Sequence, residues 1–418
     1  MKKLLIISYH ALPLDVVASY RTKAFCDYLK ENDVLPTLVT HRWEKEYKNE
    51  WKYHKSNEKE LYEFNGNYNI IRLPRPNETV KSNSSLVTLS YWLKGEFDLH
   101  LSNSYKVFKN FLFQHLKNNR YDAILAIFSP HFHLKLAYEI HKKFKIPYIL
   151  DFRDLWDNQV VTKSYKPTLK KDIQDRIIQY YWKRWLGKSM YFSTTSEKWL
   201  KLLENLTPVK GIKVRNGHEI SEISTKKFKT NKFRVAYFGR IYQYQNLKVI
   251  IEGINLFIKQ YNPKNNFEIC LIGIKSVDQF SGSDIFKSLI SKEFIKEYDY
   301  IPKKELIDFS LKKVSTFILP NLNEDNGSFF VKLFDFISIG RAVILAPKNG
   351  SENDLVLGQI KRGLITSSPN EIAEYLGKKF LEFKSSGVIE SLIDHDLLAS
   401  FHRSKQVENF AKHFYKQF

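Results

Sequence analysis

Two segments of the sequence combine glycine, cations and a carboxylate in a pattern that suits the binding of a diphosphate. Gly239-Arg240 directly follows an apolar run, and residues 327–336 have the pattern of a loop that leads into a helix. The N–H groups at a helix start bind phosphate oxygens, and Arg240 and Lys332 add positive charge. Asp335, one turn into the helix, is placed to accept hydrogen bonds from ribose hydroxyls. We therefore predict a nucleotide-diphosphate site in this half of the chain.

In the first half of the chain, polar side chains stand just after apolar runs, the position at which open α/β sheets bind ligands. They are Ser19, Arg21, His131, His133, Asp151 and Arg153. Ser19 is a candidate N-cap. Arg21, close to a helix start, is either a solvated side chain or an anion clamp. Either histidine is a loop residue or faces the site, and Asp151 and Asp154 flanking Arg153 either form a local ion-pair network or contact a substrate.

The elements that must position these residues are short apolar strands alternating with amphipathic helices. Apolar runs without polar alternation are typical of strands covered on both faces, and their alternation with helices indicates βαβ units and parallel sheets. The predicted strands are 4–9, 35–40, 70–73, 123–128, 148–152, 191–195, 234–238, 267–272, 315–319, 343–346 and 364–367.

Two domains and a returning helix fit this pattern. Pro208 interrupts the end of a helix, and a fresh strand follows a polar, lysine-rich stretch. We predict two doubly wound domains, at 1–205 and 206–397, and a helix at 398–418 that packs back on the first domain. Phe401, Phe410 and Phe414 would form the buried face of that helix. The segment 42–63, dense in charge and aromatic residues, is interpreted as a surface excursion.

The amino-acid composition limits the kinds of partner that the protein is expected to bind. Lys and Arg total 66 against 45 Asp and Glu, a formal net charge of +21, which attracts nucleic acid, an anionic membrane face or phosphorylated substrates. The cysteines, Cys26 and Cys270, lie far apart in apolar stretches, as expected for buried thiols in a reducing cytosol. Neither a signal peptide nor an apolar run of membrane-spanning length is visible, so we expect a cytoplasmic protein.

Metal and cofactor motifs are weak or missing. His131 and His133 have no accompanying carboxylate or cysteine pattern at metal spacing, and Asp394-His395-Asp396 follows no predicted strand. No Gly-x-Gly occurs, which removes the dinucleotide fingerprint. We therefore expect no metal and no cofactor, with a nucleotide-diphosphate sugar as co-substrate.

Taken in order, the motifs resemble a known family across residues 3–350. The matching segments are 6–9 with Arg21, 128–130, 151–156, 194–197, 216–217, 237–240, 332–336 and 340–341. The chain resembles the retaining glycosyltransferases of family four, in the GT-B superfamily, and is most similar to the subgroup that makes bacterial surface polysaccharides. The resemblance implies two facing Rossmann-like domains, with the donor bound mainly by the second.

The resemblance also implies roles for single residues. Arg240 would contact the donor diphosphate, to which the residues themselves add Lys332. His131, or else His133, would lie near the donor sugar, and Asn216 and the backbone at Ile301 would lie beside the sugar and the base. The full donor set is Asn216, Gly239, Arg240, Ile301, Ser328, Phe330, Lys332 and Asp335. The catalytic set is His131, Arg240 and Lys332, and the acceptor set is Ser19, Arg21, His133, Asp151 and Arg153.

The sequence departs from the family pattern at three positions. The lysine usually found a few residues after Arg240 is replaced within 242–245, and Gly327 and Asp335 stand where the family often has two glutamates. These departures leave open a catalytically inactive partner subunit. A sugar-nucleotide epimerase and a nucleic-acid-binding protein are further alternatives. The family resemblance favours a glycan or lipid-linked acceptor and no nucleic acid.

A membrane contact is a separate hypothesis. Residues 165–188 are basic and aromatic, with Tyr180, Tyr181, Trp182 and Trp185 among them. They form either a core-facing aromatic stripe or a surface for anionic lipid at the inner face of the cell membrane.

Overall fold

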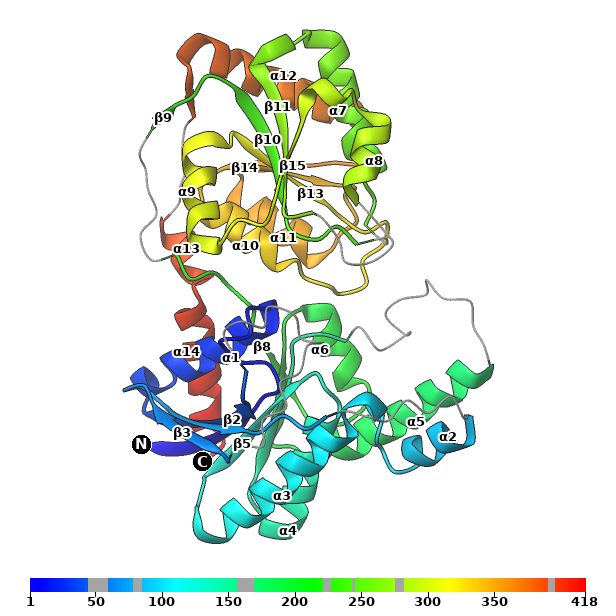
Figure 1. The fold of residues 1–418 in the computed structure, drawn as a ribbon, viewed down its shortest axis with the longest axis vertical. Coiled ribbons are helices and arrows are strands. Elements are labelled where there is room, and N and C mark those ends of the chain that lie inside the picture. The colour runs from blue at the N-terminus through cyan, green and yellow to red at the C-terminus, as the bar shows by residue number, and fades with distance from the viewer. Residues whose placement is uncertain are drawn as a thin grey trace. The chain divides into compact units, whose positions relative to one another are not determined.

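The computed structural model describes residues 1–43, 59–77, 85–155, 169–220, 227–242, 245–274, 282–389 and 395–418. Within them the chain divides into two compact units, one made of residues 1–216 and 403–418 and the other of residues 217–402. Each unit is an α/β domain built on a parallel sheet with helices on both faces (Figure 1). The first boundary falls after residue 216 rather than 205, because a short strand at 211–213 joins the first sheet.

The first unit is built on an eight-stranded sheet in the order β3-β4-β2-β1-β5-β6-β7-β8. Every neighbouring pair is parallel except β3 and β4. The strands are β1 (Lys2–Ile7), β2 (Val34–His41), β3 (Leu61–Phe64), β4 (Asn69–Leu73), β5 (Ala123–Phe128), β6 (Tyr148–Phe152), β7 (Tyr191–Thr194) and β8 (Gly211–Lys213).

Its helices cover two separate apolar faces. They are α1 (Val17–Tyr28), α2 (Ser85–Trp92), α3 (Ser102–Asn118), α4 (Phe132–Phe144), α5 (Leu169–Leu186), α6 (Glu197–Glu204) and α14 (Arg403–Tyr415). Leu4 and Ile6 of β1 pack in the cluster that holds Phe25 of α1 and Phe410 of α14, whereas Leu5 and Ile7 pack in the cluster that α3, α4 and α5 cover. The two-residue period of a strand thus places alternate apolar side chains in two cores.

The second unit has a six-stranded parallel sheet in the order β12-β11-β10-β13-β14-β15. The strands are β10 (Phe233–Phe238), β11 (Phe267–Ile272), β12 (Ile295–Tyr298), β13 (Thr316–Pro320), β14 (Ala342–Ala346) and β15 (Gly363–Ile365). This is the strand order 3-2-1-4-5-6 of a dinucleotide-binding sheet, whose order reverses between β10 and β13. A two-residue antiparallel pair, β9 (Phe228–Lys229) with β16 (Val388–Ile389), lies outside that sheet.

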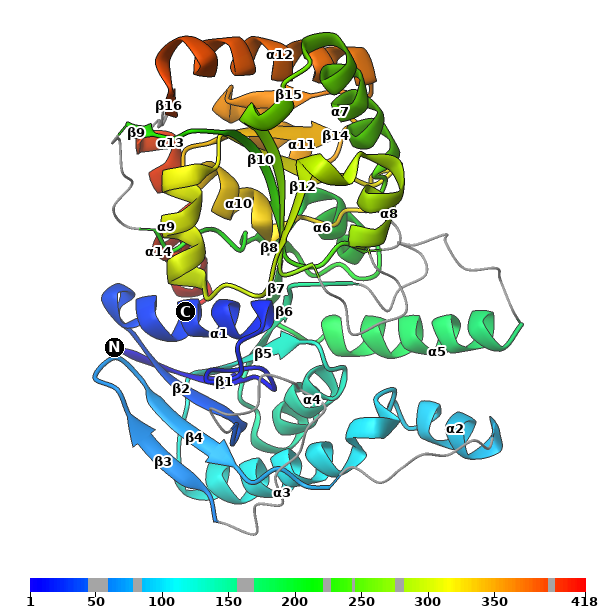
Figure 2. The same ribbon diagram turned by 45° about the horizontal axis from the view of Figure 1, so that its top comes forward.

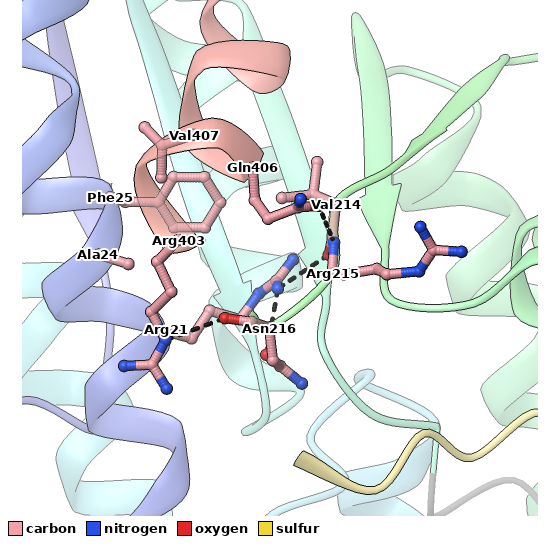
Figure 3. A pocket seen from close by; sticks show the side chains of 9 residues that line it. All are labelled: Arg21, Ala24, Phe25, Val214, Arg215, Asn216, Arg403, Gln406 and Val407. Carbon is pink, nitrogen blue, oxygen red and sulfur yellow. Dashed lines mark hydrogen bonds between the residues drawn. The ribbon is translucent and has the colours of Figure 1, made fainter. Parts of the chain in front are cut away.

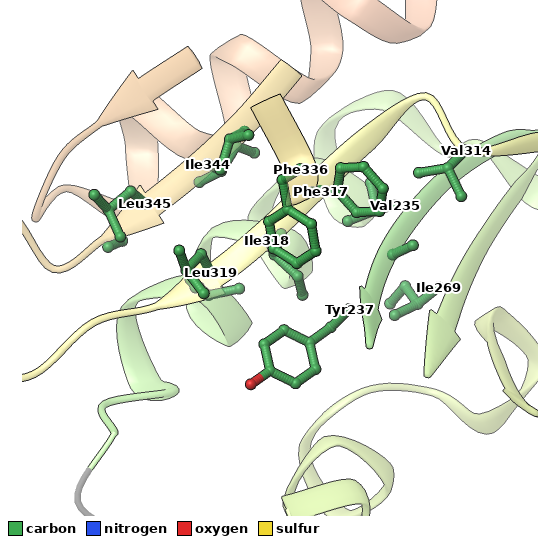
Figure 4. Packing of buried hydrophobic residues seen from close by; sticks show 14 of the residues in the cluster. Val235, Tyr237, Ile269, Val314, Phe317, Ile318, Leu319, Phe336, Ile344 and Leu345 are labelled. Carbon is green, nitrogen blue, oxygen red and sulfur yellow. The ribbon is translucent and has the colours of Figure 1, made fainter. Parts of the chain in front are cut away.

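Helices again flank both faces of this sheet, as Figures 1 and 2 show. They are α7 (Lys248–Tyr261), α8 (Gly282–Leu289), α9 (Lys303–Lys313), α10 (Val331–Ser338), α11 (Glu352–Ile360), α12 (Pro369–Ser386) and α13 (His395–Ser400). Phe336 of α10 stacks on Phe317 of β13 with ring centroids 4.2 Å apart and meets Phe238 of β10 edge-on at 4.7 Å (Figure 4). This packing fixes α10 against the two strands where the order reverses.

The predicted strands all form within two residues of their expected ends, and the parallel α/β class is confirmed. Strands that the apolar pattern missed are β3, β8, β9, β12 and β16. Each is short or lies at an edge, and all four side chains of β3 are exposed, so no apolar run marks it. Part of the predicted surface excursion therefore belongs to the sheet, while residues 44–58 lie outside the described residues.

Two expectations about helices were wrong. The last helix is divided, because α13 ends at Ser400 and α14 begins at Arg403; Phe401 packs on Phe334 in the second unit, while Phe410 packs in the first. Ser19 does not cap α1, since Val16 occupies the N-cap position and Ser19 is the third helical residue.

Two glycines allow α7 and α12 to approach closely. A Cβ atom on Gly377 of α12 would lie 2.0 Å from Cζ of Tyr261, and one on Gly253 of α7 would lie 2.6 Å from Cβ of Ile372. A side chain at Gly253 would therefore push α7 and α12 apart, and one at Gly377 would displace the Tyr261 ring.

We predict that Gly377→Ala lowers the free energy of unfolding of the second unit by about 2 kcal/mol, because the overpacked methyl group displaces the Tyr261 ring. Gly358→Ala is the matched control: its Cβ would be 3.7 Å from Ile365, and alanine is the better helix former. Urea unfolding of both variants checks this; a Gly377→Ala protein as stable as Gly358→Ala would contradict it.

Candidate functional site

In the second unit, the carboxyl end of β10 brings Gly239, Arg240 and Lys332 together. Gly239 has φ +77°, and a Cβ atom there would lie 3.1 Å from Cε of Lys332. Glycine is thus required both for the turn and for the approach of the lysine side chain. Arg240 next to it is exposed. Positive charge therefore lies at the point where the strand order of this sheet reverses. Ligands bind at this point in such sheets, and a phosphate group needs positive charge there.

The ammonium group of Lys332 is held by two oxygen atoms. Nζ donates to Oη of Tyr237 at 2.7 Å and to the carbonyl oxygen of Arg240 at 2.6 Å, and it lies 4.4 Å from the centroid of the Tyr237 ring. Burial lowers the pKa of Lys332 to about 7; the charge of Asp335 opposes this and the charge of Arg240 adds to it. Lys332 therefore titrates close to neutral pH, and a nearby anion would stabilise its charged form.

Helix α10 begins at Val331, within the segment 327–336 where a loop leading into a helix was predicted, and its first turn is open. No side chain of the described residues caps it, and the N–H groups of Val331 and Lys332 have no acceptor among those residues. Two Asx turns shape the loop before it: N–H of Gly327 donates to Asp325 and N–H of Ser328 to Asn326, at 2.8 and 2.9 Å. Gly327 has φ +85°, which explains a glycine at this position.

The predicted ribose and base contacts lie on neighbouring elements of the same unit. Asp335 is 19% exposed, and its Oδ1 atom lies 3.5 Å from Nζ of Lys303 at the start of α9. Ile301, two residues before α9, is half-buried. Asp335 therefore lies beside Lys303, a cation that was not among the predicted site residues. Lys303 is the first residue of α9, and Ile301 precedes it by two residues.

In the first unit, Arg21 and Asp151 form a buried ion pair. Nε and Nη2 of Arg21 donate to the two carboxylate oxygens of Asp151 at 2.7 and 2.6 Å, and Ser193 donates to Oδ1 at 2.6 Å. Arg21 is 4% exposed and Asp151 is fully buried. Removal of one partner of such a pair leaves a buried charge uncompensated, so the pair has a structural function.

Arg21 also ties the end of this unit together. Its Nη1 atom donates to the carbonyl oxygen of Val214 at 3.0 Å and to Oδ1 of Asn216 at 3.2 Å, and Arg403 donates to the carbonyl oxygen of Asn216 at 2.9 Å. These residues line a small pocket between α1, α14 and the chain after β8 (Figure 3). The other lining residues are Ala24, Phe25, Arg215, Gln406 and Val407.

This geometry changes the expected roles of several residues. Arg21 pairs with Asp151, so its guanidinium is committed to a protein carboxylate rather than to a ligand anion. Asp151 pairs with Arg21 and Ser193, partners that neither of the two roles considered for the segment 151–154 included. Asn216 lies in the first unit, although it was assigned to the donor.

The two histidines after β5 have different surroundings. His131 is the N-cap residue of α4, and its Nδ1 atom lies 3.2 Å from Oδ1 of Asp98. His133 is fully buried, with Nδ1 donating to the carbonyl oxygen of Ile127 at 2.7 Å, and burial lowers its pKa to about 4. His133 is thus a neutral residue of the core, whereas His131 has an acidic partner.

Asp98 is a residue that the sequence analysis missed. Its second oxygen accepts the N–H of Phe132 at 3.1 Å, so it holds both the ring of His131 and the start of α4. Burial alone would raise the pKa of Asp98, but His131 lowers it below its usual value. Asp98 lies far from His131 in sequence and outside any motif, and no pattern could have identified it. Of the remaining predicted residues, Ser19 is buried in α1, and Arg153, Ser328 and Phe330 are half-buried.

Metal ligands and membrane spans were considered for the described residues. In these ranges no group of three His, Cys, Asp or Glu side chains is arranged to hold a metal ion. The helices of the same ranges include none long and apolar enough to cross a bilayer. Metal independence remains a prediction, and Asp394 of the Asp-x-Asp motif lies outside the described residues.

Comparison with known proteins identifies the fold. No family model matches the chain, and no curated protein matches its sequence. Solved structures do match over nearly the whole length. Sucrose-phosphate synthase from Thermosynechococcus elongatus has a TM-score of 0.66 and 11% identity, covering 100% of this chain and 99% of its own.

Two further structures agree with it. Anabaena HepE in complex with UDP-glucose has a TM-score of 0.59 and 10% identity and covers 100% of both chains. WaaG, a glycosyltransferase involved in lipopolysaccharide biosynthesis, has a TM-score of 0.54 and 11% identity, covering 98% of this chain and 95% of its own. At such low identity the likeness shows the fold alone: the chain has the GT-B fold, with two Rossmann-like domains.

We predict that Lys332 makes stability depend on pH. The pKa of Lys332 is lowered in the folded protein, so between pH 7 and its usual value of 10.5 the unfolded chain binds more protons and stability rises with pH. Lys332→Met should remove that rise, so that the wild-type free energy of unfolding gains on the order of 2 kcal/mol relative to the variant between pH 7 and 9.

Urea unfolding at several pH values measures the effect. The control is Lys312→Met, whose side chain is 53% exposed and pairs with Asp308 on the surface of α9. It should leave the pH dependence unchanged. If the free energy of unfolding changed with pH in the same way in wild type and Lys332→Met, the pKa of Lys332 would not be lowered and the prediction would be wrong.

Proposed function

We propose that the chain is a glycosyltransferase that moves a sugar from a nucleotide-diphosphate sugar to a glycan or lipid-linked acceptor. The observation that carries the proposal is the meeting of Lys332, Arg240 and the open first turn of α10 at the carboxyl end of β10. Two cations and two N–H groups without an acceptor among the described residues suit a diphosphate. The GT-B fold and the UDP-glucose in the complex of Anabaena HepE support this.

The proposed reaction needs charge stabilisation more than it needs a base. As the bond between the anomeric carbon and the diphosphate oxygen breaks, negative charge grows on the leaving group, and Arg240, Lys332 and the N–H groups of α10 would stabilise it. The acceptor hydroxyl attacks from the same face and transfers its proton to the leaving phosphate oxygen. The products are the glycoside, with retained configuration, and the nucleoside diphosphate. No metal or cofactor takes part in this scheme.

We propose that Lys332 compensates for the lysine that the family has after Arg240 and this chain lacks. Nζ of Lys332 lies 2.6 Å from the carbonyl oxygen of Arg240, and we propose that it supplies the positive charge for which the family uses a lysine a few residues after Arg240. Asp335 would keep the ribose contact with a shorter side chain. The proposals of retention and of a role in surface polysaccharide synthesis rest on the family resemblance and on the involvement of WaaG in lipopolysaccharide biosynthesis. In the first unit, the proposal assigns His131, oriented by Asp98, to the sugar side of the reaction.

We predict that Arg240→Ala lowers kcat about a hundredfold, corresponding to about 3 kcal/mol of lost transition-state stabilisation. A thermal-shift screen against nucleotide sugars first identifies the donor, because a ligand that binds the folded state raises its stability. Release of the nucleoside diphosphate then measures turnover. Lys312→Ala, on the exposed side of α9, is the control and should turn over normally.

Other results would favour the alternatives. Normal turnover by Arg240→Ala would remove the proposed role of the cationic site. Conversion of the donor sugar into its epimer without an acceptor would identify an epimerase. Donor binding without transfer to any acceptor would indicate an inactive partner subunit, and tight, salt-dependent DNA binding without donor binding would indicate a nucleic-acid-binding protein.

We further propose that the first unit contacts anionic lipid at the inner face of the cell membrane. Trp182 and Trp185 of α5 are buried in the core and cannot make this contact. The opposite face of α5 and the adjoining end of α2 are exposed, and Tyr181 of α5 donates to the carbonyl oxygen of Leu93 just after α2. The exposed apolar residues of this α2–α5 surface are Leu86, Val87, Leu93, Leu169, Ile173 and Tyr180.

Charge on the α2–α5 surface favours the same partner. Positions 169, 173, 176, 180 and 183 share one face of α5 because their spacing follows the helical repeat. The exposed cations Arg176, Lys183 and Arg184 outnumber the exposed acid Asp172 on this helix. An amphipathic face of this kind gains from apolar burial and from attraction to anionic headgroups.

We predict that the protein floats with vesicles containing anionic lipid and much less with neutral vesicles. Ile173→Asp, which adds a like charge to the lipid surface, should reduce flotation severalfold. Leu381→Asp, at a position 55% exposed on α12 of the second unit, is the matched control and should float like wild type. Equal recovery with neutral and anionic vesicles would end the proposal.

A further inference from the structure

The loop before α10 is held by a buried asparagine on another helix. Asn353, in the first turn of α11, is 1% exposed. Its Oδ1 atom accepts the N–H of Phe330 at 2.9 Å, and its Nδ2 atom donates to the carbonyl oxygen of Ser328 at 3.0 Å. One planar amide thus pairs with the backbone on both sides of Phe329, as a neighbouring strand would.

This pairing decides which groups of α10 remain open to a ligand. Phe330 is the N-cap residue, and its N–H is used by Asn353. The N–H of Leu333 already donates to the carbonyl oxygen of Phe330 at 2.9 Å. The N–H groups of Val331 and Lys332 lie between them and have no acceptor in the described part of the chain. Asn353 therefore fixes the segment from which these two groups project.

The platform beneath Asn353 is independent of that pairing. The next residue, Asp354, accepts the N–H groups of Asn349 and Gly350 at 2.9 and 2.7 Å and the side-chain amide of Asn321 at 3.2 Å. Asn321 directly follows β13 and is 1% exposed. The start of α11 is thus anchored to the ends of β13 and β14, so the loss of the Asn353 amide should loosen the loop and leave α11 in place.

We propose that Asn353 is a positioning residue for the donor diphosphate, an inference that rests on the proposed function. It acts through the loop 328–330, which sets the direction of the first two N–H groups of α10 and the start of the Lys332 side chain. An amide suits this position because it supplies one donor and one acceptor without charge. An aspartate would repel the carbonyl oxygen of Ser328 and add negative charge close to the bound anion.

The experiment compares Asn353→Ala, Asn353→Asp and wild type as full-length proteins. Asn255→Ala is the matched control, because Asn255 is exposed on α7 and its side chain donates to the backbone of Leu289 at 2.8 Å. Hydrogen exchange of the ligand-free proteins reports on the tether, and calorimetric titration with UDP, GDP, ADP and CDP reports on the diphosphate site. Thermal melting confirms that each variant is folded.

We expect the hydrogen-bonded amides of the loop, those of Gly327, Ser328, Phe330 and Leu333, to exchange at least tenfold faster in both Asn353 variants, while those of α11 and the control protein do not change. The dissociation constant of the nucleoside diphosphate that wild type prefers should rise about tenfold in Asn353→Ala and further in Asn353→Asp. Unchanged exchange, or unchanged affinity, overturns the positioning role alone. A wild-type protein that binds none of the four overturns the proposed function and this role with it.

Discussion

The proposed chemistry depends on two cations held next to each other at the end of one strand. Arg240 and Lys332 repel one another, and burial adds a further cost for the lysine, so both effects lower the pKa of Lys332. Two features stabilise Lys332 in this position. Gly239 has no side chain to crowd the lysine, and the hydroxyl group of Tyr237 and the carbonyl oxygen of Arg240 accept hydrogen bonds from its ammonium group. A bound anion would relieve both effects at once. The two neighbouring cations therefore favour an anionic ligand.

The core of the second unit gives this arrangement its rigidity. Phe336 on the buried face of α10 lies against Phe317 and Phe238, the latter only two residues from Arg240. A helix fixed so close to the strand end cannot turn without disturbing the core, because protein interiors are densely packed. The first unit shows the complementary solution, in which Arg21 and Asp151 satisfy each other completely and contribute to structure. A buried arginine such as Arg21 thus pairs with a protein carboxylate, whereas we propose that the exposed Arg240 binds a ligand.

Sequence alone predicted the architecture because buried parallel strands are long apolar runs with clear ends. Edge strands such as β3 and β12 lack that signal, since water or charged side chains cover one or both faces. The grouping of Gly239, Arg240 and Lys332 followed from their positions at strand and helix ends. Pairing partners did not: Asp98 and Asn353 reach their targets from distant elements, and only the packed structure brings them there. The same limit explains why Arg21 and Asp151 were taken for ligand contacts.

The chain passes between its two units twice, after residue 216 and again after residue 402. The second unit is consequently one uninterrupted stretch inserted into the first, whose own core needs Phe410 and Phe414 from the extreme C-terminus. During synthesis the ribosome must release residues 403–415 before the N-terminal sheet can acquire this covering helix. Of the two units, the one whose synthesis begins first is thus the one that is completed last.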